Sequence, residues 1–223
     1  MRQLKPYEES FLAMARNLTK KFDCIILCEG DKDAEIIKIL NNILGLQLGD
    51  NVAVTYAGGI RNLYDLAKYI SVLARLSRKL KLLGILLDLD DKKPEDRFYS
   101  VKNSLSTAGL HLGDVKMLSP QVYNALLKID DRSLDIKIAL MGVMDLPFKR
   151  HMIEDHIIKT AIYNGYISLN ELNKFKNAKE LLAVFSGDIR GIPNHARVDG
   201  LRRAFETTNY DAGKNKRHHM KEI

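Results

Sequence analysis

At 223 residues, of which 46% are apolar, the chain can bury one sizeable core, which excludes a disordered or fibrous protein. Its longest apolar runs, 24–28 and 82–87, are far shorter than the roughly 20 residues that cross a bilayer, and its N-terminus has no signal-peptide core, so we expect a soluble, cytoplasmic protein with no membrane partner. The net charge of +7 favours a polyanionic partner, although the final stretch 213–223 contributes four basic residues against one acidic.

The first predicted elements are a helix and a buried strand. Apolar residues recur at helical spacing over 6–18, which indicates an amphipathic helix. The following run, 22–28, is apolar on both faces after Asp23, as in a central parallel strand. Its two cysteines, Cys24 and Cys28, point the same way along the strand and lie too far apart to bridge easily, so we predict reduced, buried thiols and no zinc site.

Strands and helices then alternate. We predict a helix from Asp31 to about Leu44, a strand over 51–56, a tight turn at 57–59, a helix over 62–76, a strand over 82–87 and a helix that Pro94 opens and that continues to Ala108. Three repeats of this unit favour an α/β fold with a parallel sheet and right-handed crossovers.

The pattern is weaker in the second half of the chain. Further strands are indicated over 115–118 and 135–144, helices over 150–163 and 169–185, and a last short helix over 198–205 after a loop at 186–193. The predicted organisation is an N-terminal helix (1–22), an α/β domain (23–165), a helical C-terminal extension (166–208) and a basic flexible tail (209–223).

Acidic residues follow two of the predicted strands. Glu29 follows the first strand, and Asp88 and Asp90 follow the third. Ligands bind outside the carboxyl ends of parallel strands, and residues two apart on an extended chain face the same way about 6.6 Å apart. Carboxylates gathered there repel one another unless a divalent ion such as Mg²⁺ or Mn²⁺ neutralises them. The pattern therefore predicts a metal site; the alternative is that these acids end strands and cap helices on a wet surface.

The order of these motifs resembles the Toprim domain of topoisomerases, bacterial-type primases, OLD-family nucleases and small RNA-maturing nucleases. The resemblance covers roughly 22–108 and rests on three short motifs, Glu29-Gly30, Gly58-Gly59 and Asp88-Leu-Asp90. It implies a small stand-alone Toprim protein with a Rossmann-like parallel sheet flanked by helices.

The resemblance also implies roles for individual residues. Glu29 would act as general acid or base, and Asp88 and Asp90 would be Mg²⁺ ligands. Asp33 and Asp91 are candidates for a second ion. Glu154 resembles a late acidic residue of small Toprim proteins that completes the site, with an ordinary surface acid as the alternative. Phosphate or nucleic-acid contacts are expected at the glycines and basic residues beside the motifs, namely Gly30, Lys32, Gly58, Gly59, Arg61, Lys92 and Lys93.

Several Toprim activities need parts that we do not find in this sequence. Topoisomerases use a tyrosine on a separate large domain, whereas Tyr123, Tyr163 and Tyr166 are interpreted as core or surface aromatics; bacterial-type primases need a zinc module. We therefore predict Mg²⁺-dependent phosphodiester cleavage of RNA or DNA.

Two other classes of function stay open. One is a Toprim module that binds nucleic acid without cleaving it, alone or as a homodimer. The other is a receiver-type phosphoacceptor, which also gathers acids at strand ends and for which Ser119 is a candidate hydroxyl residue. A haloacid-dehalogenase-type phosphatase carries its Asp-x-Asp after the first strand, whereas here the pair follows the third.

Overall fold

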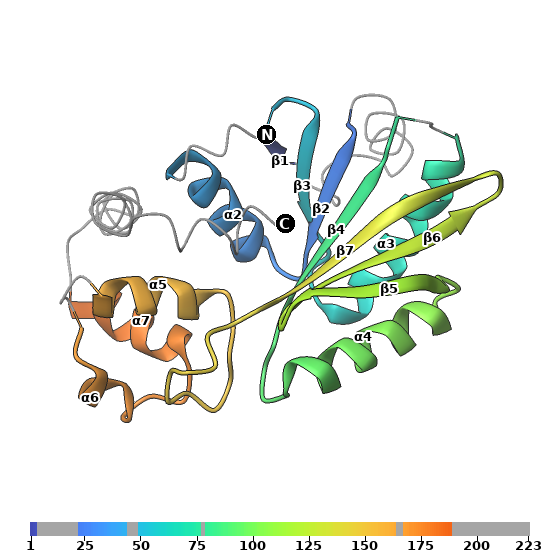
Figure 1. The fold of residues 1–223 in the computed structure, drawn as a ribbon. Helices are drawn as coiled ribbons and strands as arrows, with labels where there is room; N and C mark the ends of the chain where they lie inside the picture. Colours follow the sequence, from blue (N-terminus) through green and yellow to red (C-terminus); the bar gives the residue numbers. More distant parts are fainter. Residues whose placement is uncertain (4–21, 44–48, 77–78, 164–166, 189–223) are drawn as a thin grey trace. The chain divides into compact units, whose positions relative to one another are not determined.

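The structure of the chain is a computed structural model, and it describes residues 1–3, 22–43, 49–76, 79–163 and 167–188. These residues fall into two compact units (Figure 1). Of the described residues, the first unit comprises those within 1–87 and 94–140, and the second comprises 88–93, 141–163 and 167–188. The predicted helices over 6–18 and 198–205 and the basic tail lie outside the described residues.

The first unit is built around one mixed sheet of seven strands in the order β1-β3-β2-β4-β7-β6-β5. The strands are β1 (Arg2–Gln3), β2 (Cys24–Cys28), β3 (Val52–Tyr56), β4 (Leu82–Asp88), β5 (Leu112–Ser119), β6 (Val122–Ile129) and β7 (Arg132–Met141). The predicted α/β class is confirmed, and the sheet differs from the prediction in being only partly parallel.

The central strands of the parallel half are the ones that the sequence marks as apolar on both faces. β2 pairs in parallel with β3 on one side and β4 on the other, with Cys28 opposite Tyr56 and opposite Leu86. Ile25, Leu27 and Leu83 are fully buried. Side chains on both faces of these strands are covered, so alternation of polar and apolar residues is absent, as expected for a parallel sheet between helices.

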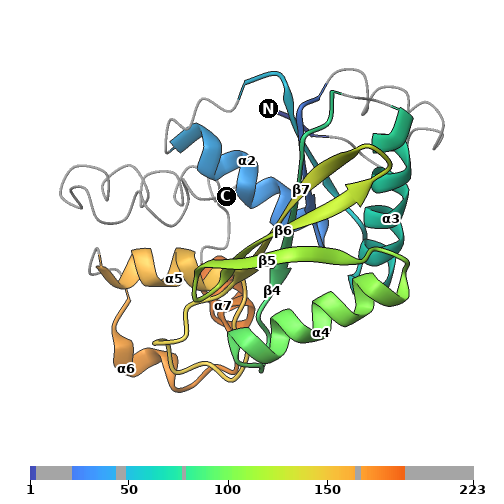
Figure 2. The same cartoon turned by 45° about the vertical axis from the view of Figure 1, so that its right-hand side comes forward.

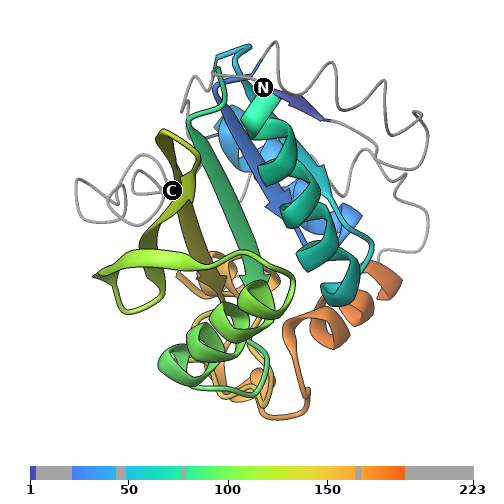
Figure 3. The same ribbon diagram turned by 90° about the vertical axis from the view of Figure 1, so that its right-hand side faces the viewer.

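Three helices cover the sheet of the first unit: α2 (Asp31–Ile43), α3 (Ile60–Leu76) and α4 (Pro94–Thr107). The chain moves from β2 to β3 in one direction and from β3 back past β2 to β4 in the other, so right-handed crossovers put α2 and α3 on opposite faces. Figure 3 shows α3 and α4 on the same face, and Figure 2 shows α4 lying along β5. The carboxyl ends of β2 and β4 therefore form a topological switch point, where open α/β sheets bind ligands.

The other half of the sheet is an antiparallel meander. β5 pairs antiparallel with β6, and β6 pairs antiparallel with β7. β7 runs parallel to β4, because Asp135 N–H donates to Lys81 at one end and Leu89 N–H donates to Met141 at the other. β6 was not predicted, and β7 ends at Met141 instead of continuing to residue 144.

The described part of the second unit contains α5 (Glu154–Tyr163), α6 (Leu169–Leu172) and α7 (Ala178–Asp188), with α5 packed against α7 (Figure 1). Its core consists of apolar side chains from these helices and from the segment that leads into α5, among them Val143, Phe148, Met152, Ile158, Leu172 and Leu181. The helix predicted over 169–185 is thus two helices. None of the helices in the described ranges is long and apolar enough to cross a membrane.

Cys24 and Cys28 are free cysteines, as predicted, with Cys28 buried and Cys24 partly buried. Burial raises the pKa of the Cys24 thiol from 9.0 to about 11, with the charge of Lys137 opposing the rise. The stability that this neutral thiol contributes is present below pH 9 and is lost as the pH rises towards 11.

We expect Cys24 to react with iodoacetamide at pH 8 about 100-fold more slowly in the folded chain than in urea, because two pKa units reduce the thiolate fraction by that factor. Peptide mass spectrometry of timed samples separates Cys24 from Cys28. Equal alkylation rates of Cys24 in the folded and unfolded chain would contradict the raised pKa.

Candidate functional site

In the first unit, the loops after β2 and β3 are joined by backbone hydrogen bonds. Ala57 N–H donates to Cys28 at 3.1 Å, and Gly59 N–H donates to Glu29 at 3.0 Å. Gly58 and Gly59 have φ angles of 73° and 127°, which residues other than glycine rarely adopt. A Cβ at Gly59 would meet nothing within 4 Å, so the space above this turn is open. The predicted glycine turn therefore lies beside the backbone of Glu29, at the start of α3.

The acidic residues Asp31 and Asp33 lie in the first turn of α2. Gly30 N–H donates to the Asp33 carboxylate at 2.8 Å, and Asp33 is buried. A carboxylate in the first turn stabilises the positive end of a helix. Asp33, which was assigned to metal binding, is thus engaged in helix capping. Lys32 and Arg61 are exposed near these loops.

A tyrosine and an arginine accompany Glu29 in the first unit. Burial raises the pKa of Tyr64, and the negative charge of Glu29 adds to the rise, while a hydrogen bond with Ser104 and the positive charge of Arg97 oppose it. Arg97, in the first turn of α4, is buried. Glu29 is half-buried, and both its charge and that of Arg97 act on Tyr64.

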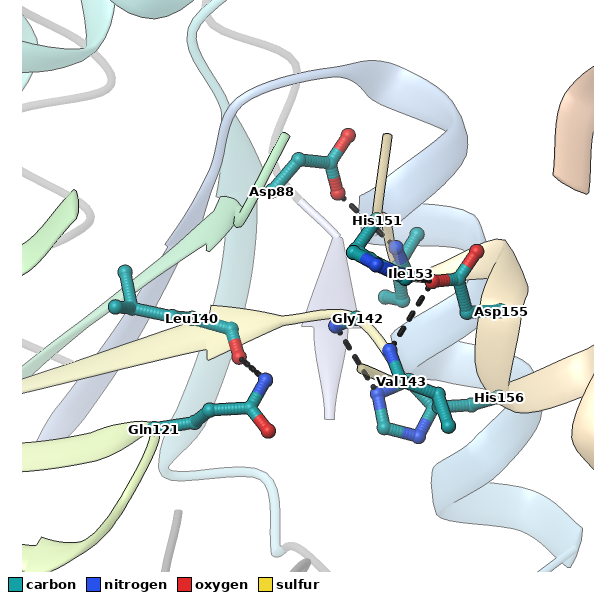
Figure 4. Close-up of polar contacts among 9 residues, drawn as sticks. All are labelled: Asp88, Gln121, Leu140, Gly142, Val143, His151, Ile153, Asp155 and His156. Atoms are coloured by element: carbon teal, nitrogen blue, oxygen red, sulfur yellow. Dashed lines mark hydrogen bonds and ion pairs between the residues drawn. The ribbon is translucent and has the colours of Figure 1, made fainter. Parts of the chain in front are cut away.

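In the second unit, Asp88 is held by the start of α5. Its Oδ1 accepts a hydrogen bond from Ile153 N–H at 3.0 Å (Figure 4). Because Ile153 immediately precedes α5, its amide belongs to the positive end of that helix, which favours an ionised carboxylate. The Asp88 side chain is 13% exposed. The local structure thus holds an anion in a nearly buried position.

Lys179, in the first turn of α7, connects Asp88 with Glu154. Its Nζ lies 3.8 Å from Asp88 Oδ2 and 3.6 Å from Glu154 Oε1. Glu154 is buried, whereas the Lys179 side chain is 49% exposed. Sequence reasoning gave Glu154 the alternative of an ordinary surface acid; the structure instead buries Glu154 and pairs it with the ammonium group that also attracts Asp88.

Asp90 is placed differently from the expectation of an extended strand. β4 ends at Asp88, and Asp90 has φ of 58°, in the left-handed region. Its backbone forms an isolated antiparallel bridge with His151, with N···O distances of 2.8 and 2.7 Å. Asp88 and Asp90 are therefore not two residues apart on an extended strand, and the backbone position of Asp90 depends on the bridge to His151.

His151 belongs to a buried pair with Asp155. His151 Nδ1 lies 2.9 Å from Asp155 Oδ2, which also accepts a hydrogen bond from Val143 N–H at 3.0 Å; Figure 4 shows both groups directed at this carboxylate. Burial raises the pKa of Asp155, and the bonds from Val143 and His151 oppose the rise. This pair fixes the His151 ring, and the His151 backbone fixes Asp90.

Asp88 and Glu154 are the oxygen donors of the second unit that could hold a hard divalent ion. Among the residues that the structure describes, no three His, Cys, Asp or Glu side chains lie close enough to form a complete metal cage. Mg²⁺ does not need one, since it binds through one or two carboxylates, water and substrate phosphate. Asp88 and Glu154 already attract the same cationic group, and both offer oxygen ligands.

Three predicted residues lie in the loop after Asp90, and three residues of this region were missed. Asp91, Lys92 and Lys93 are exposed. The missed residues are His151, Asp155 and Lys179. His151 and Asp155 carry a weak signal, the i,i+4 spacing, but Lys179 gives no local signal because its partners are distant in sequence.

A protein-family model described as "Protein of unknown function (DUF3226)" matches residues 23–180. Searches against the curated proteins and against the solved structures gave no match.

Proposed function

The chain belongs to this family of unknown function, and we propose that it is a Mg²⁺-dependent, nucleic-acid-directed Toprim protein that cleaves phosphodiester bonds. The observation that carries the proposal is the Asp88 carboxylate at the carboxyl end of β4, held by the Ile153 amide just before α5 and close to a cation that it shares with Glu154. Mn²⁺ is expected to replace Mg²⁺, because both prefer oxygen ligands.

Strand order supports a role for Glu29 in the same reaction. β2 and β4 are adjacent parallel strands, and Cys28 lies opposite Leu86. Glu29 follows Cys28 directly, and Asp88 follows Leu86 by two residues. Each acid therefore follows the carboxyl end of a parallel strand, the usual position of ligand-binding residues in open α/β folds.

In the proposed mechanism each group has a separate task. Asp88 and Glu154, with Asp90 as a further candidate ligand, would hold the divalent ion, which would supply stabilisation of negative charge on the phosphate oxygens. Glu29 takes a proton from the attacking water or gives one to the leaving oxygen, as the phosphorus–oxygen bond to that oxygen breaks. The open turn at Gly58 and Gly59 lets the substrate backbone approach closely.

The proposed substrate is RNA or DNA because the chain is basic and its basic residues accompany the acidic motifs. Lys32 and Arg61 flank the loops of the first unit, and Lys92 and Lys93 follow the acids of the second. Such side chains hold phosphates without reading sequence, and they make binding weaken with rising salt.

The receiver-type alternative has less support from the fold. Its candidate hydroxyl, Ser119, ends β5, which is the edge strand of the antiparallel meander. A receiver domain would carry that residue at the end of a parallel strand next to the acidic site. We therefore keep the receiver only as an outcome of the experiment below.

The test is cleavage of end-labelled single- and double-stranded RNA and DNA with Mg²⁺ or EDTA. We expect Mg²⁺-dependent products from wild type and a rate about 10²- to 10⁴-fold lower for Glu29→Gln, the usual range for removing a general acid or base. Glu35→Gln is the matched control, since Glu35 is an exposed glutamate in the first turns of α2, and it should cleave like wild type.

Each other result has a defined meaning. Salt-sensitive nucleic-acid binding without cleavage by wild type overturns the nuclease in favour of the non-catalytic module. Incorporation of phosphate at Asp88 from a small phosphodonor, without cleavage, favours the receiver. A Glu29→Gln variant that cleaves at the wild-type rate removes Glu29 from the mechanism.

A further inference from the structure

Lys179 stands where the proposed divalent ion would bind. Its ammonium group is within 4 Å of an oxygen of Asp88 and of an oxygen of Glu154, so the two carboxylates share one positive charge. Both carboxylates are nearly buried, at 13% and 7% side-chain exposure, whereas Lys179 is half exposed. Lys179 is therefore the one of these three charged side chains that can move into solvent.

Two like charges held together in a partly buried position raise the free energy of the folded chain unless a cation compensates them. Asp88 cannot turn away easily, because Ile153 N–H holds its other oxygen at 3.0 Å. Glu154 is fixed at the start of α5. Lys179 reaches both from the first turn of α7, a helix that packs against α5. Its long side chain keeps the charge mobile while its backbone stays in place.

We propose that Lys179 is a built-in counter-ion of the Asp88–Glu154 pair, which keeps the two carboxylates in position before a divalent ion binds and competes with that ion for them. The inference rests on the proposed function, because it assumes a divalent ion at these carboxylates. Binding of the ion then requires the ammonium group to withdraw, which lowers metal affinity and makes the bound state reversible.

The first experiment measures the counter-ion role without metal. Thermal unfolding is followed in EDTA for wild type, Lys179→Gln, Asp88→Asn and the double variant. We expect Lys179→Gln to lower Tm by about 2–4 °C, with a smaller decrease when Asp88 is already Asn, because the charge that needs compensation is then reduced. Lys159→Gln is the matched control: it removes a lysine of the same unit that pairs with the exposed Asp145.

The second experiment measures competition with the metal. Mn²⁺ alone is titrated and its free concentration is read by electron paramagnetic resonance, and Mg²⁺ is added in the unfolding experiment. We expect Lys179→Gln to bind Mn²⁺ about five- to tenfold more tightly than wild type and to show a larger Mg²⁺-induced rise in Tm, because a cation about 4 Å from the ligands has been removed. Lys179→Arg and Lys159→Gln should bind Mn²⁺ like wild type.

The outcomes separate the inference from the proposed function. Equal Mn²⁺ affinity for wild type and Lys179→Gln overturns the counter-ion and leaves the metal site standing. Absence of Mn²⁺ binding in every variant overturns the proposed metal-dependent function. It also overturns the proposed competition between Lys179 and the divalent ion. Additive Tm changes for Lys179→Gln and Asp88→Asn in EDTA overturn the electrostatic coupling between the two residues.

Discussion

Replacing Asp88 by Asn should lower Mg²⁺-dependent cleavage about 10³-fold. Charge stabilisation by a bound divalent ion is worth several kcal/mol, and a loss of about 4 kcal/mol corresponds to three powers of ten in rate. The asparagine Oδ1 can still accept the hydrogen bond from Ile153 N–H, so the start of α5 should keep its position. The loss should therefore appear in metal affinity and in cleavage rate, and hardly in the cooperativity of unfolding.

The control for this variant is Asp96→Asn, which neutralises an exposed aspartate in the first turn of α4. It should retain wild-type cleavage and Mn²⁺ affinity. Both variants change the net charge equally, so a general effect of charge on nucleic-acid binding would reduce both rates alike. Equal activity of Asp88→Asn and wild type would remove Asp88 from the proposed reaction.

The parts of the fold that the sequence predicts well are those governed by short-range patterns. β2 and β4 are apolar on both faces, and α2 and α4 begin at acidic residues or proline. β6 was missed because it follows β5 after only Pro120 and Gln121, so that the two strands read as one irregular segment. Strand partners are not encoded locally, which is why the antiparallel half of the sheet was not foreseen.

Helix boundaries in the second unit were misjudged although their signals are present. Ser168 caps α6 in a capping box with Glu171, and the Asn177 side chain accepts the Glu180 N–H at 3.0 Å at the start of α7. Two serine or asparagine residues, each three positions before a glutamate, mark two helix starts where one long helix was predicted.

For the candidate site as well, residues marked by local patterns were predicted, and residues defined by long-range contacts were not. Glu29, Asp88 and Glu154 were found because acids at strand and helix ends are visible in the sequence. Lys179 and the His151–Asp155 pair could not be found, since the bonds that define them join segments far apart in the sequence or arise from a bridge between two loops. Asp90 was predicted as a ligand on the assumption that the strand continues through it, whereas β4 ends at Asp88 and Asp90 has a positive φ.

Gly142 lies close to His151, which forms the backbone bridge to Asp90, and Gly142→Ala should destabilise the chain by about 3 kcal/mol. Gly142 has φ of 146°, and an added Cβ would lie 2.6 Å from the His151 Cβ and 3.1 Å from its carbonyl carbon. Overpacking costs about 1–3 kcal/mol and backbone strain a similar amount. We expect Tm to fall by about 6–12 °C in thermal unfolding followed by circular dichroism.

Gly109→Ala separates the two contributions. Gly109 also has a positive φ, of 91°, but an added Cβ there would meet nothing within 4 Å, so this variant carries the strain without the clash. It should lose about half as much Tm and retain wild-type Mn²⁺ affinity. Gly142→Ala must instead push His151 away from its position, which disturbs the backbone bridge to Asp90 and should weaken Mn²⁺ binding in the fraction that remains folded. If both variants lose the same stability and bind Mn²⁺ alike, the close approach of His151 to Gly142 does not hold Asp90 in place.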